Sequence, residues 1–170
     1  MNKTGIIYGI NGPVIYLKGD SGFKISEMVY VGKDHLVGEV IGLKKGMTTI
    51  QVFEETTGLR PGETVIGTGD AISVLLGPGI IHNIFDGIQR PLEEIAKTSG
   101  KYISRGVSVD SLDTEKKWHT HITVKEGDVV GPGTVIAETQ ETASILHKSM
   151  VPPNIAEGTV IKAAPDGDYT

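Results

Sequence analysis

Turn-forming residues divide the first 75 residues into short apolar runs, and this spacing constrains the fold more than any other feature of the sequence. Glycine, proline, asparagine and aspartate separate nearly every pair of runs. Short strands of this kind avoid exposed edges by closing on themselves. Residues 1–75 are therefore predicted to form a six-stranded β-barrel, with strands at Gly5–Ile10, Val14–Leu17, Glu27–Val31, Leu36–Leu43, Thr48–Phe53 and Thr64–Ile66.

The run Thr48–Phe53 shows which side chains of this barrel are expected inside. Ile50 and Val52 alternate with Thr49 and Gln51, and a period of two places the two sets on opposite faces of a strand. The sequence Lys44-Lys45-Gly46 predicts a hairpin, and Leu59-Arg60-Pro61-Gly62-Glu63 predicts a type I or type II turn.

Residues 76–117 are predicted to form a helical and irregular connector. Apolar residues between Ile80 and Ile88 follow the i, i+3, i+4 spacing of a helix, so a first helix is expected from Ile80 to Arg90. Pro91 ends it and suits the first position of a second helix, which should stop at Ser99-Gly100.

Residues 118–170 are β-rich again and are predicted to form a second, barrel-sandwich-like domain. Strands are expected at His119–Val124, Val129-Val130, Val135–Glu138, Ile145–Val151 and Gly158–Ala163. Pro165-Asp166-Gly167-Asp168 is a strong turn signal with only two residues after it. This predicts a turn without a returning strand, in a domain truncated at its C-terminal end or completed by something else.

Composition narrows the class of protein. Gly 23, Pro 8 and only 5% aromatic residues favour many short strands over a helical bundle, hence a mainly β fold. The absence of cysteine excludes disulfides and thiol catalysis. A net charge of −5 with dispersed Lys and Arg argues against nucleic acid as a partner, and no apolar run is long enough for membrane insertion. The chain is expected to be cytoplasmic.

Motifs for nucleotide chemistry are missing from the sequence. A phosphate loop needs glycines followed by Lys and Ser/Thr at fixed spacing, and no segment has them. Asp110 and Asp113 resemble an acid/base pair only superficially, since aspartates in a polar loop are typical turn formers and caps. No catalytic residue and no bound cofactor are predicted in this chain.

His119 and His121 lie two positions apart on a predicted strand. Both imidazoles then face the same side and could share a metal ion. A third ligand is not apparent nearby, which favours the plainer interpretation of two partly exposed histidines beside Trp118.

Lys148 offers an alternative function. The sequences Val124–Ile136, His147-Lys148-Ser149-Met150 and Glu157–Val160 resemble the layout of biotinyl and lipoyl carrier domains, in which a lysine at an exposed hairpin tip carries the cofactor. The match is incomplete, because His147 and Ser149 stand where methionines flank that lysine. Shared barrel-sandwich architecture explains the resemblance better than modification of Lys148.

A second resemblance covers nearly the whole chain. In order and spacing, the sequence resembles the N-terminal part of the alpha chain, or A subunit, which is the catalytic component of V-type (archaeal/vacuolar-type) ATPases and ATP synthases. The matching segments are Gly5-Ile6, Asn11-Gly12-Pro13-Val14, Leu36–Ile41, Ile50–Leu59, Leu76-Gly77-Pro78-Gly79, Phe85–Leu92, Arg105-Gly106-Val107 and Met150-Val151-Pro152-Pro153.

This resemblance implies a part in a machine that couples ATP hydrolysis or synthesis to proton or sodium transport. The barrel would join a crown of A and B subunits. Residues 118–170 would belong to the inserted, non-homologous region of the alpha chain, which is associated with peripheral-stalk contact. ATP and Mg²⁺ would bind in a later domain, so this chain alone is predicted to be inactive in a complex peripheral to the membrane. A stand-alone assembly module remains an alternative.

Two residues are the candidates for an intersubunit contact. Arg90 and its neighbour Gln89 lie beside the proline that is expected to break the connector helices. An arginine there can bridge carboxylates or carbonyl groups of a second chain. An intramolecular salt bridge is an equally reasonable role for Arg90.

Overall fold

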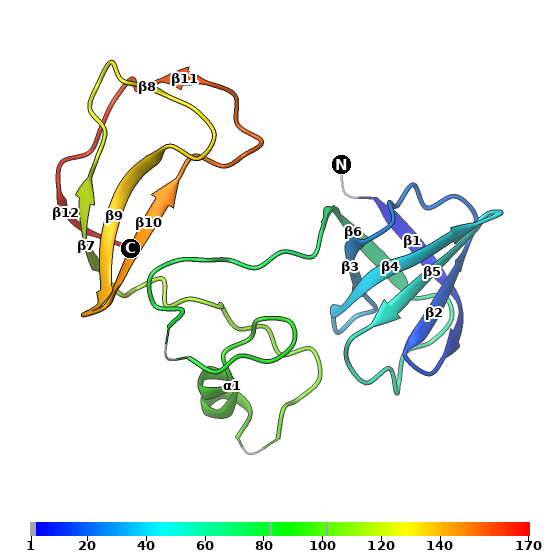
Figure 1. The fold of residues 1–170 in the computed structure, drawn as a ribbon. Coiled ribbons are helices and arrows are strands. Elements are labelled where there is room, and N and C mark those ends of the chain that lie inside the picture. The colour runs from blue at the N-terminus through cyan, green and yellow to red at the C-terminus, as the bar shows by residue number, and fades with distance from the viewer. Residues whose placement is uncertain (1–2, 82, 101) are drawn as a thin grey trace. The chain divides into compact units, whose positions relative to one another are not determined.

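The computed structural model of the chain describes residues 3–81, 83–100 and 102–170. It is mainly β, as predicted, with one short helix (Figure 1). The chain divides into two compact units, the first made of Met1–Val74 with Ala96–Ser108 and the second of Leu75–Ile95 with Val109–Thr170. The stretch expected as a separate connector is thus shared between these two units.

The first unit contains the predicted six-stranded barrel. Its strands are β1 (Thr4–Asn11), β2 (Val14–Lys18), β3 (Glu27–Val31), β4 (Leu36–Lys44), β5 (Met47–Val52) and β6 (Thr64–Ala71). They close in the order β1-β2-β5-β4-β3-β6, with every neighbouring pair antiparallel. Closure leaves the sheet without an unpaired edge.

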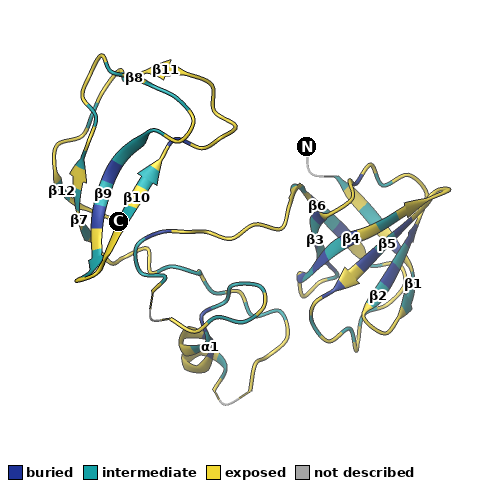
Figure 2. Ribbon diagram, viewed as in Figure 1, coloured by how far each residue is buried: buried dark blue, intermediate teal, exposed yellow. Residues whose placement is uncertain are grey.

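Side chains at alternating positions of the strands are buried in the barrel interior, and Figure 2 colours the buried positions dark blue. In β5, Ile50 and Val52 are buried whereas Thr49 and Gln51 are not, which confirms the predicted alternation. Burial of aliphatic side chains provides the main drive for closing the barrel. The core residues are Ile7, Ile15, Leu17, Phe23, Val29, Val31, Leu36, Val40, Ile50, Val52 and Val65.

Both predicted turns are present in the barrel. Lys45 and Gly46 have φ of 45° and 73° and connect β4 directly to β5, a two-residue hairpin whose positive φ values match the twist of the strands. In the second turn the N–H of Glu63 donates to the Arg60 carbonyl at 3.2 Å, and Gly62 has φ 95°. Proline followed by a residue of positive φ is the pattern of a type II turn.

The predicted helix from Ile80 to Arg90 is wrong. Residues 83–90 form turns and an isolated bridge in the structure, while His82 lies outside the described residues. Gln89 has a left-handed φ of 62°, and the side chain of Asp86 accepts backbone N–H groups that a helix would need. Ile84 is 68% exposed, so the apolar spacing does not create a buried stripe.

The second predicted helix is confirmed as α1 (Leu92–Ser99), which directly follows Pro91. The N–H of Ile95 donates to the Pro91 carbonyl at 3.0 Å, and Ile95 is buried. Gly100, with φ 76°, ends the helix in the left-handed conformation that glycine adopts most easily.

The second unit contains a four-stranded antiparallel sheet in the order β10-β9-β7-β12 and a two-stranded sheet, β11-β8 (Figure 1). Three of the predicted strands end earlier than expected: β7 at Ile122, β10 at Met150 and β11 at Thr159. The strands are β7 (Trp118–Ile122), β8 (Val129–Val130), β9 (Val135–Thr142), β10 (Ile145–Met150), β11 (Gly158–Thr159) and β12 (Gly167–Tyr169).

The prediction of a turn without a returning strand is wrong. Gly167–Tyr169 forms β12 immediately after the turn and pairs with β7, with Gly167 opposite Thr120 and Tyr169 opposite Trp118. Because the returning segment is only three residues long, its strand character is too short to recognise from period-two alternation.

Candidate functional site

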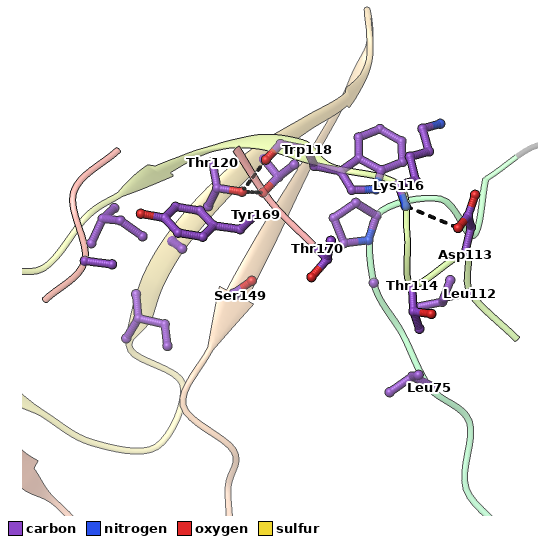
Figure 3. A pocket seen from close by; sticks show the side chains of 17 residues that line it. Leu75, Leu112, Asp113, Thr114, Lys116, Trp118, Thr120, Ser149, Tyr169 and Thr170 are labelled. Atoms are coloured by element: carbon purple, nitrogen blue, oxygen red, sulfur yellow. Dashed lines mark hydrogen bonds between the residues drawn. The ribbon is translucent and has the colours of Figure 1, made fainter. Parts of the chain in front are cut away.

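A cavity of about 590 Å³ lies within the second unit, against one face of the four-stranded sheet (Figure 3). Trp118, Thr120 and Ile122 line it from alternating positions of β7, so that one face of this strand forms a wall. The other walls come from residues 75–78, residues 112–116, β9, β10 and the segment from Ala164 to Thr170. The lining is mostly apolar.

Three polar side chains that line this cavity, Asp113, Thr120 and Thr139, make hydrogen bonds within the chain. Thr120 Oγ1 and Thr139 Oγ1 lie 2.9 Å apart, and the Thr120 hydroxyl also donates to the Trp118 carbonyl at 3.2 Å. Asp113 accepts the backbone N–H groups of Glu115 and Lys116, the turn-forming role predicted for it. An apolar cavity with a few hydroxyl groups is suited to binding an apolar group.

Lys116 and Trp118 form the most distinctive contact beside the cavity. The Lys116 ammonium group lies 4.0 Å from the centroid of the Trp118 indole (Figure 3). At this distance the ring quadrupole attracts the cation. Both residues line the cavity, so this contact is part of its wall.

His119 and His121 project from the opposite face of β7, as their exposure shows. The structure brings His119 against Asp168 of β12 and His121 against Asp166, the residue before β12. His119 Nδ1 lies 2.9 Å from Asp168 Oδ1, and His121 Nδ1 lies 2.6 Å from Asp166 Oδ2. Because a carboxylate only accepts hydrogen bonds, each imidazole carries its proton on Nδ1.

In the pair of His121 and Asp166, the pKa of each partner is shifted from its ordinary value. The hydrogen bond to Asp166 and its negative charge raise the pKa of His121 above 6.5, with a further contribution from Glu138. Hydrogen bonds from the Ile122 backbone N–H and from His121 lower the pKa of Asp166 below 3.8. The charged pair is therefore favoured between these two values.

The metal site considered for His119 and His121 has no geometric support. Across residues 3–81, 83–100 and 102–170, no group of three or more His, Cys, Asp or Glu side chains is arranged to hold a metal ion. The ring nitrogen of each histidine that faces β12 is instead occupied by a carboxylate.

Lys148 is not at a hairpin tip, so that part of the carrier-domain hypothesis is wrong. It lies in the middle of β10, opposite Glu138 of β9, and its Nζ is 3.8 Å from Glu138 Oε1. β9 continues to Thr142, beyond its predicted end at Glu138, so the hairpin turns between Thr142 and Ile145, away from Lys148. A lysine paired across a sheet is not presented on a protruding turn.

Arg90 makes the intramolecular salt bridge considered for it. Its Nε donates to Asp86 Oδ2 at 2.7 Å, and both side chains are largely buried. Partial burial alone raises the pKa of Asp86, but hydrogen bonds from Arg90 and Ile88 and the charge of Arg90 lower it below 3.8. The pair closes the Asp86–Arg90 turn, and an intersubunit role for Arg90 stays a prediction.

Gln89 has a role within the chain as well. Its side-chain carbonyl accepts the N–H of Leu75 at 2.8 Å, and its amide group donates to the Leu75 carbonyl at 2.7 Å. The side-chain amide of Gln89 thus bonds to both the N–H and the carbonyl group of Leu75, as the backbone of a neighbouring strand would. This contact secures one wall of the cavity, since Leu75 lines it.

Glu141 is a positioning residue that sequence analysis missed. Its Oε1 accepts the backbone N–H groups of Gly79 at 2.8 Å and Ile81 at 2.9 Å. These bonds connect the end of β9 to the segment that carries Pro78 of the cavity wall. The partner is 62 residues away in the chain, so no local pattern reveals it.

Replacing Glu141 with alanine should loosen this segment. Hydrogen bonds to a charged acceptor contribute about 1.5–3 kcal/mol, so amide exchange of Gly79 and Ile81 should accelerate by about 10- to 100-fold. Glu141→Gln, which keeps one carbonyl oxygen, should have a smaller effect, and exposed Glu126→Ala should have none. Unchanged exchange in Glu141→Ala, measured by NMR, would show that the bonds do not hold the segment.

Asp166 and Asp168 were predicted only as turn residues. The two aspartates are two positions apart, as are His119 and His121. This matching spacing is the one feature of the sequence that could have indicated the two histidine–aspartate pairs. It could not be used without knowing that residues 167–169 pair with β7.

In comparisons with known proteins, a domain of one family matches each of the two parts of the chain. The beta-barrel domain of the ATP synthase alpha/beta family matches residues 7–69, and the ATP synthase alpha/beta subunit barrel-sandwich domain matches residues 109–170. In the part of the chain that the structure describes, no helix is long and apolar enough to cross a membrane.

Relatives with curated names match along the entire chain. The V-type ATP synthase alpha chain of Halothermothrix orenii is 51% identical over 100% of this chain and 29% of its own length. The A-type ATP synthase A subunits of Methanopyrus kandleri (51%, 98% of this chain, 28% of its own length) and Pyrococcus abyssi (49%, 100%, 17%) are similar to it as well. The chain spans less than a third of the length of these relatives. By both domain matches and this identity, the chain belongs to the ATP synthase alpha/beta family, where it is similar to the N-terminal portion of the alpha chain, or A subunit, of V/A-type ATP synthases.

Proposed function

We propose that this chain is the non-catalytic N-terminal portion of the A subunit of a V/A-type ATP synthase, a peripheral part of a membrane-attached complex. The observation that carries the proposal is about 50% identity to A subunits and alpha chains over the whole chain. Its barrel would pack in a ring of A and B subunits, and its second unit would contact the peripheral stalk. ATP and Mg²⁺ would bind in a domain of the longer protein.

The outer surface of the barrel supports a role in packing. Ile6 and Tyr8 of β1 point outward on either side of buried Ile7, and they are 55% and 59% exposed. Tyr8 also carries the ammonium group of Lys18 at 5.3 Å from its ring centroid. Large apolar side chains grouped on a surface mark sites of protein contact.

Capture by partner subunits tests the proposal. The purified chain should be retained by a B subunit or by a peripheral-stalk heterodimer, and calorimetric titration with MgATP should give no binding heat. Capture by neither partner would overturn the assembly role. Binding of MgATP would overturn the non-catalytic assignment, because it would require a site outside the phosphate-loop pattern.

Charge placed on β1 should weaken capture by the B subunit. Ile6→Glu with Tyr8→Glu puts two carboxylates on the proposed contact, and loss of one good apolar contact reduces affinity by about tenfold or more. Gln51→Glu, an exposed position of β5, is the matched control. Circular dichroism should confirm that both variants keep the β fold, and equal capture of both would exclude β1 from the interface.

A further inference from the structure

The segment from Asp166 to Tyr169 is held to β7 by side chains as much as by backbone. β12 has three residues and lies at one edge of the sheet order. The two histidine–aspartate pairs described above join it to β7. Asp166 Oδ1 also accepts the Ile122 N–H at 2.8 Å. A strand this short has few ladder hydrogen bonds, so these side-chain contacts supply a large part of its attachment.

The same segment closes one side of the cavity. Tyr169 and Thr170 line it together with Trp118, and Tyr169 is opposite Trp118 in the strand register (Figure 3). The Tyr169 hydroxyl donates to the Pro165 carbonyl at 2.6 Å, which holds the ring across the turn. Detachment of β12 would therefore expose the cavity and Trp118.

The charged groups around His121 come from β9, from β10 and from the segment of Asp166 to Asp168. Asp166 lies at 2.6 Å from it, and Glu138 of β9 is opposite it in register. Lys148 of β10 neutralises part of the Glu138 charge from 3.8 Å, and on the same face Asp168 is paired with His119. Carboxylates thus outnumber fixed cations around the imidazole, an arrangement that favours its protonated form.

We propose that β12 is a pH-sensitive clasp over the apolar cavity, closed when His121 is protonated and loosened when it loses its proton. Charge-assisted hydrogen bonds are roughly twice as strong as neutral ones, so the His121–Asp166 contact weakens on deprotonation without vanishing. All residues of this clasp belong to the second unit, and its behaviour is independent of the proposed function.

The pKa shifts of His121 and Asp166 determine how the stability of the clasp changes with pH. The pKa of His121 is raised in the folded chain, so its contribution is complete below 6.5 and is lost as pH rises through the folded value. The pKa of Asp166 is lowered, so its contribution is present above 3.8 and is lost as pH falls through the folded value. The clasp is firmest between these limits.

Quenching of tryptophan fluorescence tests the clasp, because Trp118 is the one tryptophan of the 170-residue chain. The acrylamide quenching constant should be about twofold larger at pH 8.5 than at pH 5.5, since local opening admits the quencher. His121→Gln should abolish this pH dependence, whereas His147→Gln on β10 should retain it. His119→Gln controls for direct quenching of Trp118 by its neighbouring imidazole.

A second measurement keeps the proposal falsifiable if a variant is unstable. NMR titration of the His121 ring in the unmodified chain should give a midpoint above 6.5, and Asp166→Asn should return it toward that value. A pH dependence of quenching that persists in His121→Gln would overturn the clasp. A His121 midpoint that is unaffected by Asp166→Asn would overturn it as well.

Discussion

Replacing Glu27 with alanine should destabilise the barrel by about 3 kcal/mol, since a buried carboxylate with backbone partners leaves those partners unsatisfied when it is removed. The Glu27 side chain is fully buried at the start of β3. Its Oε1 accepts the Gly69 N–H at 2.9 Å, and its Oε2 accepts the Lys24 N–H at 2.8 Å. Lys3 Nζ lies 4.0 Å from Oε2 and balances the charge.

The position of Glu27 explains why this carboxylate is tolerated inside an aliphatic core. The register between β3 and β6 shifts between Glu27 and Val29, which leaves backbone N–H groups without a ladder partner. The carboxylate supplies acceptors on both sides of this irregularity. It therefore joins β6 to the turn that precedes β3.

Urea unfolding followed by circular dichroism measures the loss, with two control variants. Glu27→Gln keeps the volume and one acceptor oxygen, so we expect a smaller loss, whereas Glu39→Ala on the outward face of β4 should change stability by less than about 0.5 kcal/mol. Equal stabilities of Glu27→Ala and Glu39→Ala would mean that the carboxylate does not hold the strands together.

The barrel could be predicted from sequence because its information is local. Each strand alternates with a period of two, and glycine or proline marks nearly every boundary, so errors in strand ends stay within a few residues except for β6, which continues to Ala71. The buried role of Glu27 could not be predicted, since its partner Gly69 is 42 residues away.

The connector shows where periodicity misleads. Ile80, Ile84 and Ile88 have helical spacing, but Asp86 and Gln89 bind backbone groups with their side chains and stabilise turns instead. Apolar spacing indicates a helix only when a face is available to bury it. Here Ile84 stays exposed within its unit.

The candidate site depends almost entirely on contacts between distant segments. His119 and His121 were recognised, but the aspartates that pair with them lie 49 and 45 residues further along the chain. The cavity likewise combines segments from Leu75 to Thr170. Such combinations require the strand order, which single-sequence patterns do not contain.

Replacing Gly38 with alanine should destabilise the barrel by about 2–3 kcal/mol, because the added methyl group overpacks the contact between β4 and β5. A Cβ at this position would lie 2.8 Å from the Gln51 carbonyl oxygen and 3.1 Å from Ile50 Cγ2. The first neighbour is backbone in a closed sheet, so it cannot move without separating the two strands. Gly38→Val should be worse still, since its branches have even less room.

Gly42 of the same strand provides the matched control. A Cβ there would meet Thr49 Cβ at 3.5 Å, an ordinary contact, so Gly42→Ala should be neutral or should stabilise by up to about 1 kcal/mol by restricting the unfolded chain. Both variants are compared by the urea midpoint, and amide exchange of Ile50 reports on the β4–β5 pairing directly. Because both changes add one methyl group to β4, equal destabilisation would assign the effect to loss of glycine in general and refute the close approach at Gly38.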